Sequence, residues 1–97
     1  MKLRFTPRAT QDLVEIADYI REQNPNASLR VRSAILDSLQ YLILFPELGR
    51  RQKLPGVRKL VTRKYSYLVY YNVDQTADEI VILSIQHPAR ERRSEDN

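Results

Sequence analysis

Apolar residues recur at helical spacing through the first half of the chain. Thr6 and Pro7 form a helix start, because a Thr side chain accepts hydrogen bonds from free N–H groups and Pro fits the first helical position. A stripe at i, i+3, i+4 and i+7 spacing follows, with Leu13, Ile16, Ala17 and Ile20. The pattern predicts a helix over residues 7–23. Three acidic residues beside the stripe are expected on a solvated flank: Asp12, Glu15 and Asp18.

A second helix is predicted after the break at residues 24–26. This short connection, Asn-Pro-Asn, supplies a new cap and makes the second helix an antiparallel neighbour of the first. Apolar residues lie on more than one of its faces, which predicts that it is the more buried helix. One stripe, at steps of seven, consists of Leu29, Leu36 and Ile43. Pro46 ends the helix, and Gly49 is expected to adopt a positive φ.

The remaining segments alternate in the manner of strands. Residues 2–5 predict a short edge strand, residues 57–62 a short mixed strand, and residues 65–73 a longer strand with clean alternation. Residues 74–78 predict a hairpin loop. The run from Ile80 to Leu83 is apolar on both faces, so its strand is expected at the centre of the sheet or covered on both sides.

The predicted order β-α-α-β-β-β is typical of an α+β fold in which an antiparallel helical hairpin packs on one face of a curved antiparallel β-sheet. The 97 residues fit one domain, residues 1–97, with a polar tail over residues 90–97. The chain has no cysteine, which excludes disulfides and thiolate metal sites. No run of about 18 apolar residues and no secretory apolar segment occurs, so the cytoplasm is expected and a membrane span is not.

The net charge of +4 is concentrated in the second half of the chain. Residues 48–73 contain no acid and seven bases: Arg50, Arg51, Lys53, Arg58, Lys59, Arg63 and Lys64. Cations without nearby carboxylates favour an anionic partner, either a nucleic acid or an acidic protein. A solvated basic face is an equal alternative on composition alone.

His87 is the single histidine and ends the last predicted strand. Its imidazole suits acid–base chemistry or contact with a target, but a hydrogen bond to the backbone is the favoured interpretation. One histidine without cysteine does not supply a transition-metal site, and the sequence lacks a glycine-rich phosphate loop and a Ser-His-Asp set. We therefore expect neither a metal nor a cofactor.

Several fragments in a fixed order carry a family resemblance. They are Thr6-Pro7-Arg8-Ala9 leading into residues 12–20, the FPELGR run at residues 45–50, the Val57-Arg58 strand start, and ILSIQHPAR at residues 82–90. Together they resemble the toxins of the RelE/ParE superfamily, especially its ParE-like branch. The resemblance spans nearly the whole chain and implies a toxin that a partner antitoxin neutralises within a hetero-oligomer.

The two branches of the superfamily imply different activities. ParE-like members poison DNA gyrase, whereas RelE-like members cut messenger RNA on the ribosome, and a shared fold does not choose between them. The RelE-like pattern uses Lys and Arg from the sheet with a C-terminal Tyr, and here no Tyr follows Tyr71. This departure favours gyrase inhibition without catalysis, together with a ParD-like antitoxin. The alternative is a ribosome-dependent mRNA endoribonuclease that uses Lys59, Arg63, Arg90 and His87.

Two sets of site residues follow from this interpretation. Target contact is assigned to the basic residues of the sheet and of the C-terminal end: Arg58, Lys59, Arg63, Lys64, His87 and Arg90. Antitoxin contact is assigned to the stripe at steps of seven and to the basic connection: Leu29, Leu36, Ile43, Arg50, Arg51 and Lys53. Nucleic acid is a possible indirect partner. A third alternative is a non-toxic nucleic-acid-binding module whose affinity falls steeply with salt.

Overall fold

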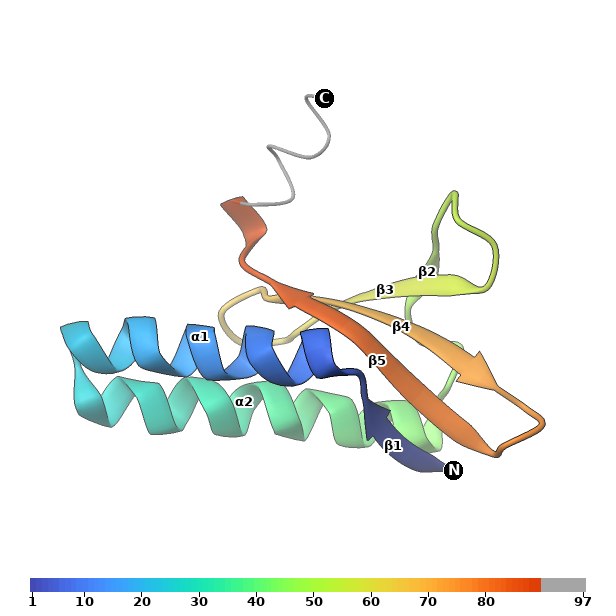
Figure 1. The fold of residues 1–97 in the computed structure, drawn as a ribbon, viewed down its shortest axis with the longest axis horizontal. Helices are drawn as coiled ribbons and strands as arrows, with labels where there is room; N and C mark the ends of the chain where they lie inside the picture. The colour runs from blue at the N-terminus through green and yellow to red at the C-terminus, as the bar shows by residue number, and fades with distance from the viewer. Residues whose placement is uncertain (90–97) are drawn as a thin grey trace.

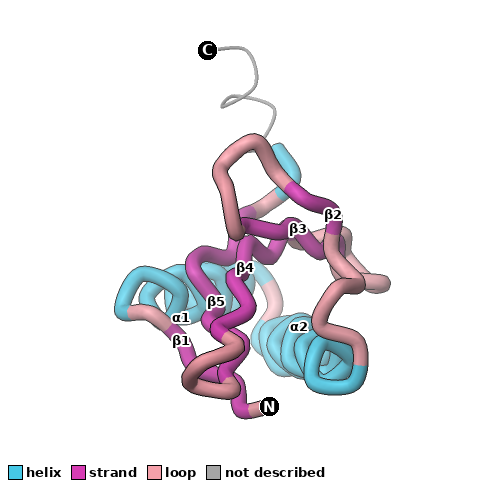
Figure 2. The backbone as a smooth tube through the Cα atoms, turned by 90° about the vertical axis from the view of Figure 1, so that its right-hand side faces the viewer, coloured by secondary structure: helices cyan, strands magenta, loops and turns pink. Residues whose placement is uncertain are grey.

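The structure, a computed structural model, describes residues 1–89 as two helices packed on one five-stranded sheet. Its elements in chain order are β1 (Lys2–Phe5), α1 (Pro7–Gln23), α2 (Pro25–Leu44), β2 (Arg50–Arg51), β3 (Val57–Val61), β4 (Leu68–Asp74) and β5 (Glu79–Gln86). The helices run antiparallel to each other beside the twisted strands (Figure 1). Figure 2 shows α1 beside β5, and α2 on the side of β2 and β3. The predicted α+β class is confirmed.

The helix ends are capped as the sequence predicts. Thr6 Oγ1 accepts a hydrogen bond from Ala9 N at 3.1 Å, and α1 has the predicted bounds. Asn24 ends α1 and caps α2 through its side-chain oxygen. The Ser28 hydroxyl donates to the Ala17 carbonyl oxygen at 2.8 Å and joins the two helices. Within residues 1–89, neither helix combines the length and apolarity needed to cross a membrane.

The strand order in the sheet is β1-β5-β4-β3-β2. β5 lies between β1 and β4, which confirms the central place predicted from its apolar residues. The sheet is mixed: the predicted antiparallel arrangement holds for β2 to β5, whereas β1 runs parallel to β5 with Leu3 opposite Ile80. Hairpins make neighbouring strands antiparallel, but β1 and β5 are joined through both helices and three other strands. Nothing local in the sequence therefore fixes the direction of β1.

The connection between β3 and β4 is a turn stabilised by Thr62. Tyr65 and Ser66 have φ angles of 66° and 53°, so the strand does not begin at Tyr65 as predicted. β4 begins instead at Leu68. Thr62 is buried, and its hydroxyl oxygen accepts a hydrogen bond from Tyr67 N at 3.0 Å. A hairpin connection at residues 62–65 is expected from the sequence, but the alternating pattern of residues 65–73 concealed that the turn extends through Ser66.

The core lies between the helices and the face of the sheet that they cover. α2 contributes Ile35, Leu39 and Leu42, and the sheet contributes Val69 and Tyr71, all of them fully buried. Burial of such a side chain is worth roughly 1.5–3 kcal/mol relative to exposure. α2 buries more side chains than α1 does, as predicted. Residues 90–97, the predicted polar tail, lie outside the described residues.

Asp12 lies inside the molecule and not on the predicted solvated flank. The residue is 7% exposed, and its Oδ2 accepts a hydrogen bond from Ile85 N at 3.0 Å. Arg8 Nε lies 3.9 Å from the same oxygen. Asp12 follows the buried Ala9 by three positions and precedes Ile16 by four, so it belongs to the inner stripe of α1. The carboxylate therefore joins α1 to the end of β5.

Replacing Asp12 by alanine leaves the Ile85 N–H buried without this acceptor. We expect Asp12→Ala to lower the free energy of unfolding by about 1–3 kcal/mol, measured by urea denaturation at pH 7. The matched control is Asp18→Ala on the same helix, where Asp18 pairs with Arg21 in solvent. A change of no more than about 0.5 kcal/mol is expected for the control. Equal effects of the two substitutions would contradict the role assigned to Asp12.

Candidate functional site

The hydroxyl of Tyr71 holds the connection between α2 and β2. Tyr71 is fully buried on β4, and its Oη donates to the Pro46 carbonyl oxygen and accepts from Gly49 N, both at 2.8 Å. Burial raises the pKa of Tyr71 above the ordinary phenol value of 10.0; the Gly49 N–H and the Arg58 guanidinium act to lower it, and Glu47 acts to raise it. One core side chain thus holds both ends of the segment from Pro46 to Gly49.

Gly49 is required by close packing and not by its φ angle. A Cβ atom at this position would lie 2.7 Å from the Tyr71 ring and 2.9 Å from the Lys59 carbonyl oxygen. Both distances are shorter than atoms in van der Waals contact allow. The positive φ predicted for Gly49 is found instead at Gly56, whose φ is 80°. The approach of an aromatic ring, which no local pattern reveals, is the reason for a glycine at position 49.

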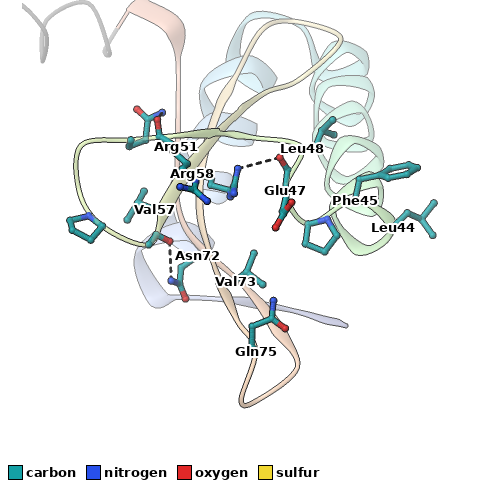
Figure 3. Close-up of a pocket in the computed structure, with 14 residues that line it drawn as sticks. Leu44, Phe45, Glu47, Leu48, Arg51, Val57, Arg58, Asn72, Val73 and Gln75 are labelled. Atoms are coloured by element: carbon teal, nitrogen blue, oxygen red, sulfur yellow. Dashed lines mark hydrogen bonds between the residues drawn. The ribbon is translucent and has the colours of Figure 1, made fainter.

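Arg58 anchors the same segment from β3. Its Nη1 donates to the Gly49 carbonyl oxygen at 2.8 Å and to the Glu47 carbonyl oxygen at 3.3 Å. Figure 3 shows the Arg58 guanidinium directed toward Glu47 among the residues that line a pocket. Arg58 is among the residues predicted to contact a target, and that contact stays a prediction. Its two hydrogen bonds to carbonyl oxygens give it a structural role that the sequence did not indicate.

The two-residue strand β2 brings cations onto neighbouring strands. Arg50 lies opposite Lys59, and Arg51 lies opposite Arg58. From the sequence, Arg50 and Arg51 are expected in the connection between the second helix and the sheet. A segment of two residues is too short to show the alternation from which a strand is predicted. Like charges directly opposite each other destabilise an antiparallel pair. This ladder brings four cationic residues together on two neighbouring strands, and the guanidinium of one of them, Arg58, is held by carbonyl oxygens.

The cations of β2 and β3 line two different pockets. Arg51 and Arg58 line a pocket of ≈ 950 Å³ together with Glu47, Asn72 and Gln75, next to the β4–β5 turn (Figure 3). Cations, a carboxylate and amides are mixed in its wall. The wall of this first pocket therefore carries charges of both signs.

The second pocket has a volume of ≈ 530 Å³ and lies between α2 and β3. A further pocket of ≈ 640 Å³ shares Ser38, Tyr41 and Arg63 with it and continues along α2. The two form one α2–β3 groove. Its large apolar lining residues are Leu29, Tyr41, Leu48, Leu60, Val61 and Tyr65. Its charged lining residues are Arg30, Asp37, Arg50, Lys59, Arg63 and Lys64.

The α2–β3 groove collects residues from both predicted site sets. Lys59, Arg63 and Lys64 were assigned to target contact, whereas Arg50 and Leu29 were assigned to antitoxin contact. The fold places these five side chains along one surface. Residues that the sequence assigns to different partners therefore belong to one candidate site.

Other predicted site residues lie elsewhere. Leu36 and Ile43 are half-buried on α2, and neither is among the described residues that line the groove. Lys53 is exposed in the loop between β2 and β3, and Arg90 lies outside the described residues. The predicted stripe at steps of seven is thus not one exposed strip, because a helix packed on a sheet turns part of such a stripe toward the core.

Tyr41, Leu48 and Val61 were not predicted as site residues. Their exposed fractions are 43%, 52% and 48%, which is high for large apolar side chains that lie near a core. Each residue is of a type that is ordinary for its element: Tyr41 lies in helix α2, Leu48 in the connection after it, and Val61 in strand β3. Only the fold, which places α2 across a pocket from β3, brings them together.

His87 occupies a different pocket on the side of α1. Its Nδ1 accepts a hydrogen bond from Ala89 N at 3.1 Å, which confirms the predicted bond to the backbone. Its ring meets Tyr67 edge to face, with centroids 5.7 Å apart. This pocket of ≈ 570 Å³ is also lined by Glu15 and Tyr19 of α1. His87 therefore does not share a pocket with the cations of the α2–β3 groove.

Comparison with known proteins identifies the family. Residues 3–92 match the model of the ParE toxin of the type II toxin-antitoxin system parDE. The chain belongs to the ParE toxin family. A relative from Sinorhizobium fredii (strain NBRC 101917 / NGR234), the candidate toxin Y4kP, is 30% identical over 86 residues, which cover 89% of this chain and 86% of Y4kP. Membership of the ParE family makes the chain the toxin component of a type II toxin–antitoxin system, with an antitoxin as its partner.

Solved structures share the fold of this ParE-family toxin. A chain of the chromosomal ParDE system from P. aeruginosa is 28% identical with a TM-score of 0.78, covering 90% of this chain and 95% of that one. A chain of the RelBE2 toxin–antitoxin complex from Mycobacterium tuberculosis is 26% identical with a TM-score of 0.64, covering 89% and 95%. A chain of the E. coli RelBE complex, 19% identical with a TM-score of 0.63 over 89% and 94%, shows likeness of fold alone.

Removing the Tyr71 hydroxyl tests its hold on the connection. Tyr71→Phe keeps the ring but leaves Gly49 N and the Pro46 carbonyl oxygen without their shared partner. We expect the free energy of unfolding to fall by about 1–3 kcal/mol in urea denaturation at pH 7. Tyr65→Phe, at an exposed tyrosine in the β3–β4 turn, serves as control and should change it by no more than about 0.5 kcal/mol. A loss for Tyr71→Phe no larger than for the control would rule out this role.

The raised pKa of Tyr71 also predicts how stability depends on alkaline pH. The unfolded chain loses the phenol proton first as the pH rises above 10.0, so the folded state binds more protons there. Stability should therefore be complete below that pH and decline as the pH rises through the folded pKa. Tyr67, whose pKa burial raises as well, contributes in the same direction. Tyr71→Phe should show a shallower decline between pH 9 and 12 in urea denaturation; an unchanged slope contradicts the assignment.

Proposed function

We propose that this ParE-family toxin inhibits DNA gyrase by binding to it and that a ParD-like antitoxin holds the toxin inactive. The family model and the P. aeruginosa ParDE structure support the ParE-like branch. The α2–β3 groove is the observation that carries the proposal. Large exposed apolar side chains beside several cations are typical of a surface that binds an acidic region of another protein. We place both partners and this toxin in the cytoplasm.

The position of His87 supports binding rather than RNA cleavage. General acid–base catalysis needs the acid, the base and the cations around one substrate phosphate. Lys59 and Arg63 line the α2–β3 groove on the side of α2, whereas His87 lines a pocket on the side of α1. The lone pair of His87 Nδ1 accepts the Ala89 N–H. The endoribonuclease alternative therefore lacks an assembled acid–base pair within the described residues.

Gyrase assays test the proposal directly. Purified toxin should inhibit DNA supercoiling by gyrase or increase gyrase-dependent DNA cleavage, and the co-expressed antitoxin should abolish the effect. Arg63→Ala should raise the toxin concentration for half-inhibition by at least about fivefold, since a well-placed interface cation is worth 1 kcal/mol or more. The control is Arg32→Ala, at an exposed arginine of α2 that is not among the lining residues of the groove.

Two results would overturn the gyrase proposal. One is unaltered gyrase behaviour at a large excess of folded toxin. The other is messenger RNA cleavage, seen as new transcript ends in arrested cells that express the toxin, together with unaffected gyrase. The second result would establish the endoribonuclease alternative in its place.

A further inference from the structure

The pocket of ≈ 570 Å³ on the side of α1, here called the α1 pocket, differs in charge from the α2–β3 groove. Its described lining residues include the carboxylates of Asp12 and Glu15 and neither lysine nor arginine. The Asp12 carboxylate already accepts a backbone N–H of β5 and lies near Arg8. Glu15 is exposed and accepts a hydrogen bond from Gln11 Nε2 at 3.3 Å. Within residues 1–89, no lysine or arginine forms an ion pair with it.

Two tyrosines add aromatic surface to the α1 pocket. Tyr19 is 66% exposed on α1, and the buried Tyr67 lines the pocket from the segment before β4. Burial, and then the charge of the Tyr19 phenol, raise the pKa of Tyr67 above 10.0, so its ring is uncharged at neutral pH. The face of a neutral phenol ring attracts a cation, and a guanidinium stacks on such a ring while it donates to a carboxylate. The lining of this pocket therefore suits an arginine side chain.

The chain passes the rim of the α1 pocket where the described residues end. Ala89, the last described residue, is exposed and lines the pocket. Pro88 and Ala89 have a helical backbone (Figure 1), and His87 Nδ1 accepts a hydrogen bond from Ala89 N at 3.1 Å. A side chain that accepts from the second N–H of a helix, followed by proline at the first position, is a helix N-cap. The described chain thus ends on the first residues of a helix, beside the pocket.

The sequence after Ala89 supplies arginines at the spacing that such a helix requires. Residues 90–93 are Arg-Glu-Arg-Arg. On a helix that begins at Pro88, position 93 follows Ala89 by one turn, about 6 Å along the axis, on the same face. A helical side chain also tilts back toward the preceding turn. Glu91 falls about 200° around the axis from Ala89, away from the carboxylate of Glu15. Helical spacing therefore puts Arg93 on the side of the pocket and the glutamate on the opposite side.

We propose that the α1 pocket is a guanidinium-binding site whose occupant is Arg93 of the same chain, paired with Glu15 and stacked on Tyr19. The contact clamps the C-terminal end of the toxin onto α1. Because Arg93 is tethered four residues from the rim of the pocket, its effective concentration there is high, and a contact of modest strength is sufficient. This clamp does not depend on the identity of the target or of the antitoxin, so the gyrase assays leave it unaffected.

A spin label next to Arg93 tests the clamp in the full-length toxin. The chain has no cysteine, so Ser94→Cys accepts a single nitroxide, whose motion is measured by electron paramagnetic resonance. In this background Glu15→Gln is compared with Glu22→Gln, an exposed position of α1 that is not among the described lining residues. Arg93→Gln is compared with Arg90→Gln. Glu15→Gln and Arg93→Gln should each shorten the correlation time of the label at least about twofold, and the two controls should leave it nearly unchanged.

A charge exchange separates an ion pair from a structural effect. Glu15→Arg and Arg93→Glu should each release the label, and the two substitutions together should restore its slow motion. Circular dichroism confirms that each variant is folded, and Tyr19→Leu replaces a Glu15 variant that is not. Equal effects of Glu15→Gln and Glu22→Gln, or a label that already moves fast beside the unaltered Glu15 and Arg93, overturn the clamp. Slow motion that disappears on dilution overturns it in favour of an arginine from a second copy.

Discussion

The hydroxyl of Tyr71 is the interaction on which the candidate site depends. Tyr71 extends from β4 into the core. Its Oη hydrogen-bonds to the backbone on both sides of the bend that follows α2, at Pro46 and Gly49. The chain changes there from helix to strand, where backbone groups lose regular partners and must find others. Arg58 supplies a second anchor through two carbonyl oxygens. The short strand β2, and with it the cationic wall of the α2–β3 groove, is placed by these contacts.

Much of the fold was predictable because local rules and tertiary packing agree. The caps at Thr6 and Asn24 fix where the helices begin, and the apolar run of β5 fixes its central place. The failures have physical causes. Asp12 is buried because its carboxylate replaces a missing strand partner for Ile85 N, a need that arises only when α1 packs on the sheet. The direction of β1 depends on a long-range pairing with no hairpin to set it.

The candidate site was predictable in charge but not in shape. The acid-free run of residues 48–73 correctly indicated a cationic surface. It did not distinguish Arg58, which is hydrogen-bonded to the backbone of the connection, from Arg63, which lines the groove. Nor did it reveal Tyr41 and Val61, because an apolar residue on a helix or strand is first expected in the core. Which of them stay exposed depends on how α2 lies relative to the sheet, and this is set by the whole core.

Hydrogen exchange at the Gly49 amide tests most directly whether this anchored connection preforms the site. The amide donates to Tyr71 Oη in a buried position. If the connection is held as described, this proton should exchange only through the global unfolding of the free toxin, with a protection free energy equal to that of the slowest core amides. Rapid exchange at Gly49 with a fully protected core would contradict the account, because the wall of the α2–β3 groove would then open without unfolding of the protein.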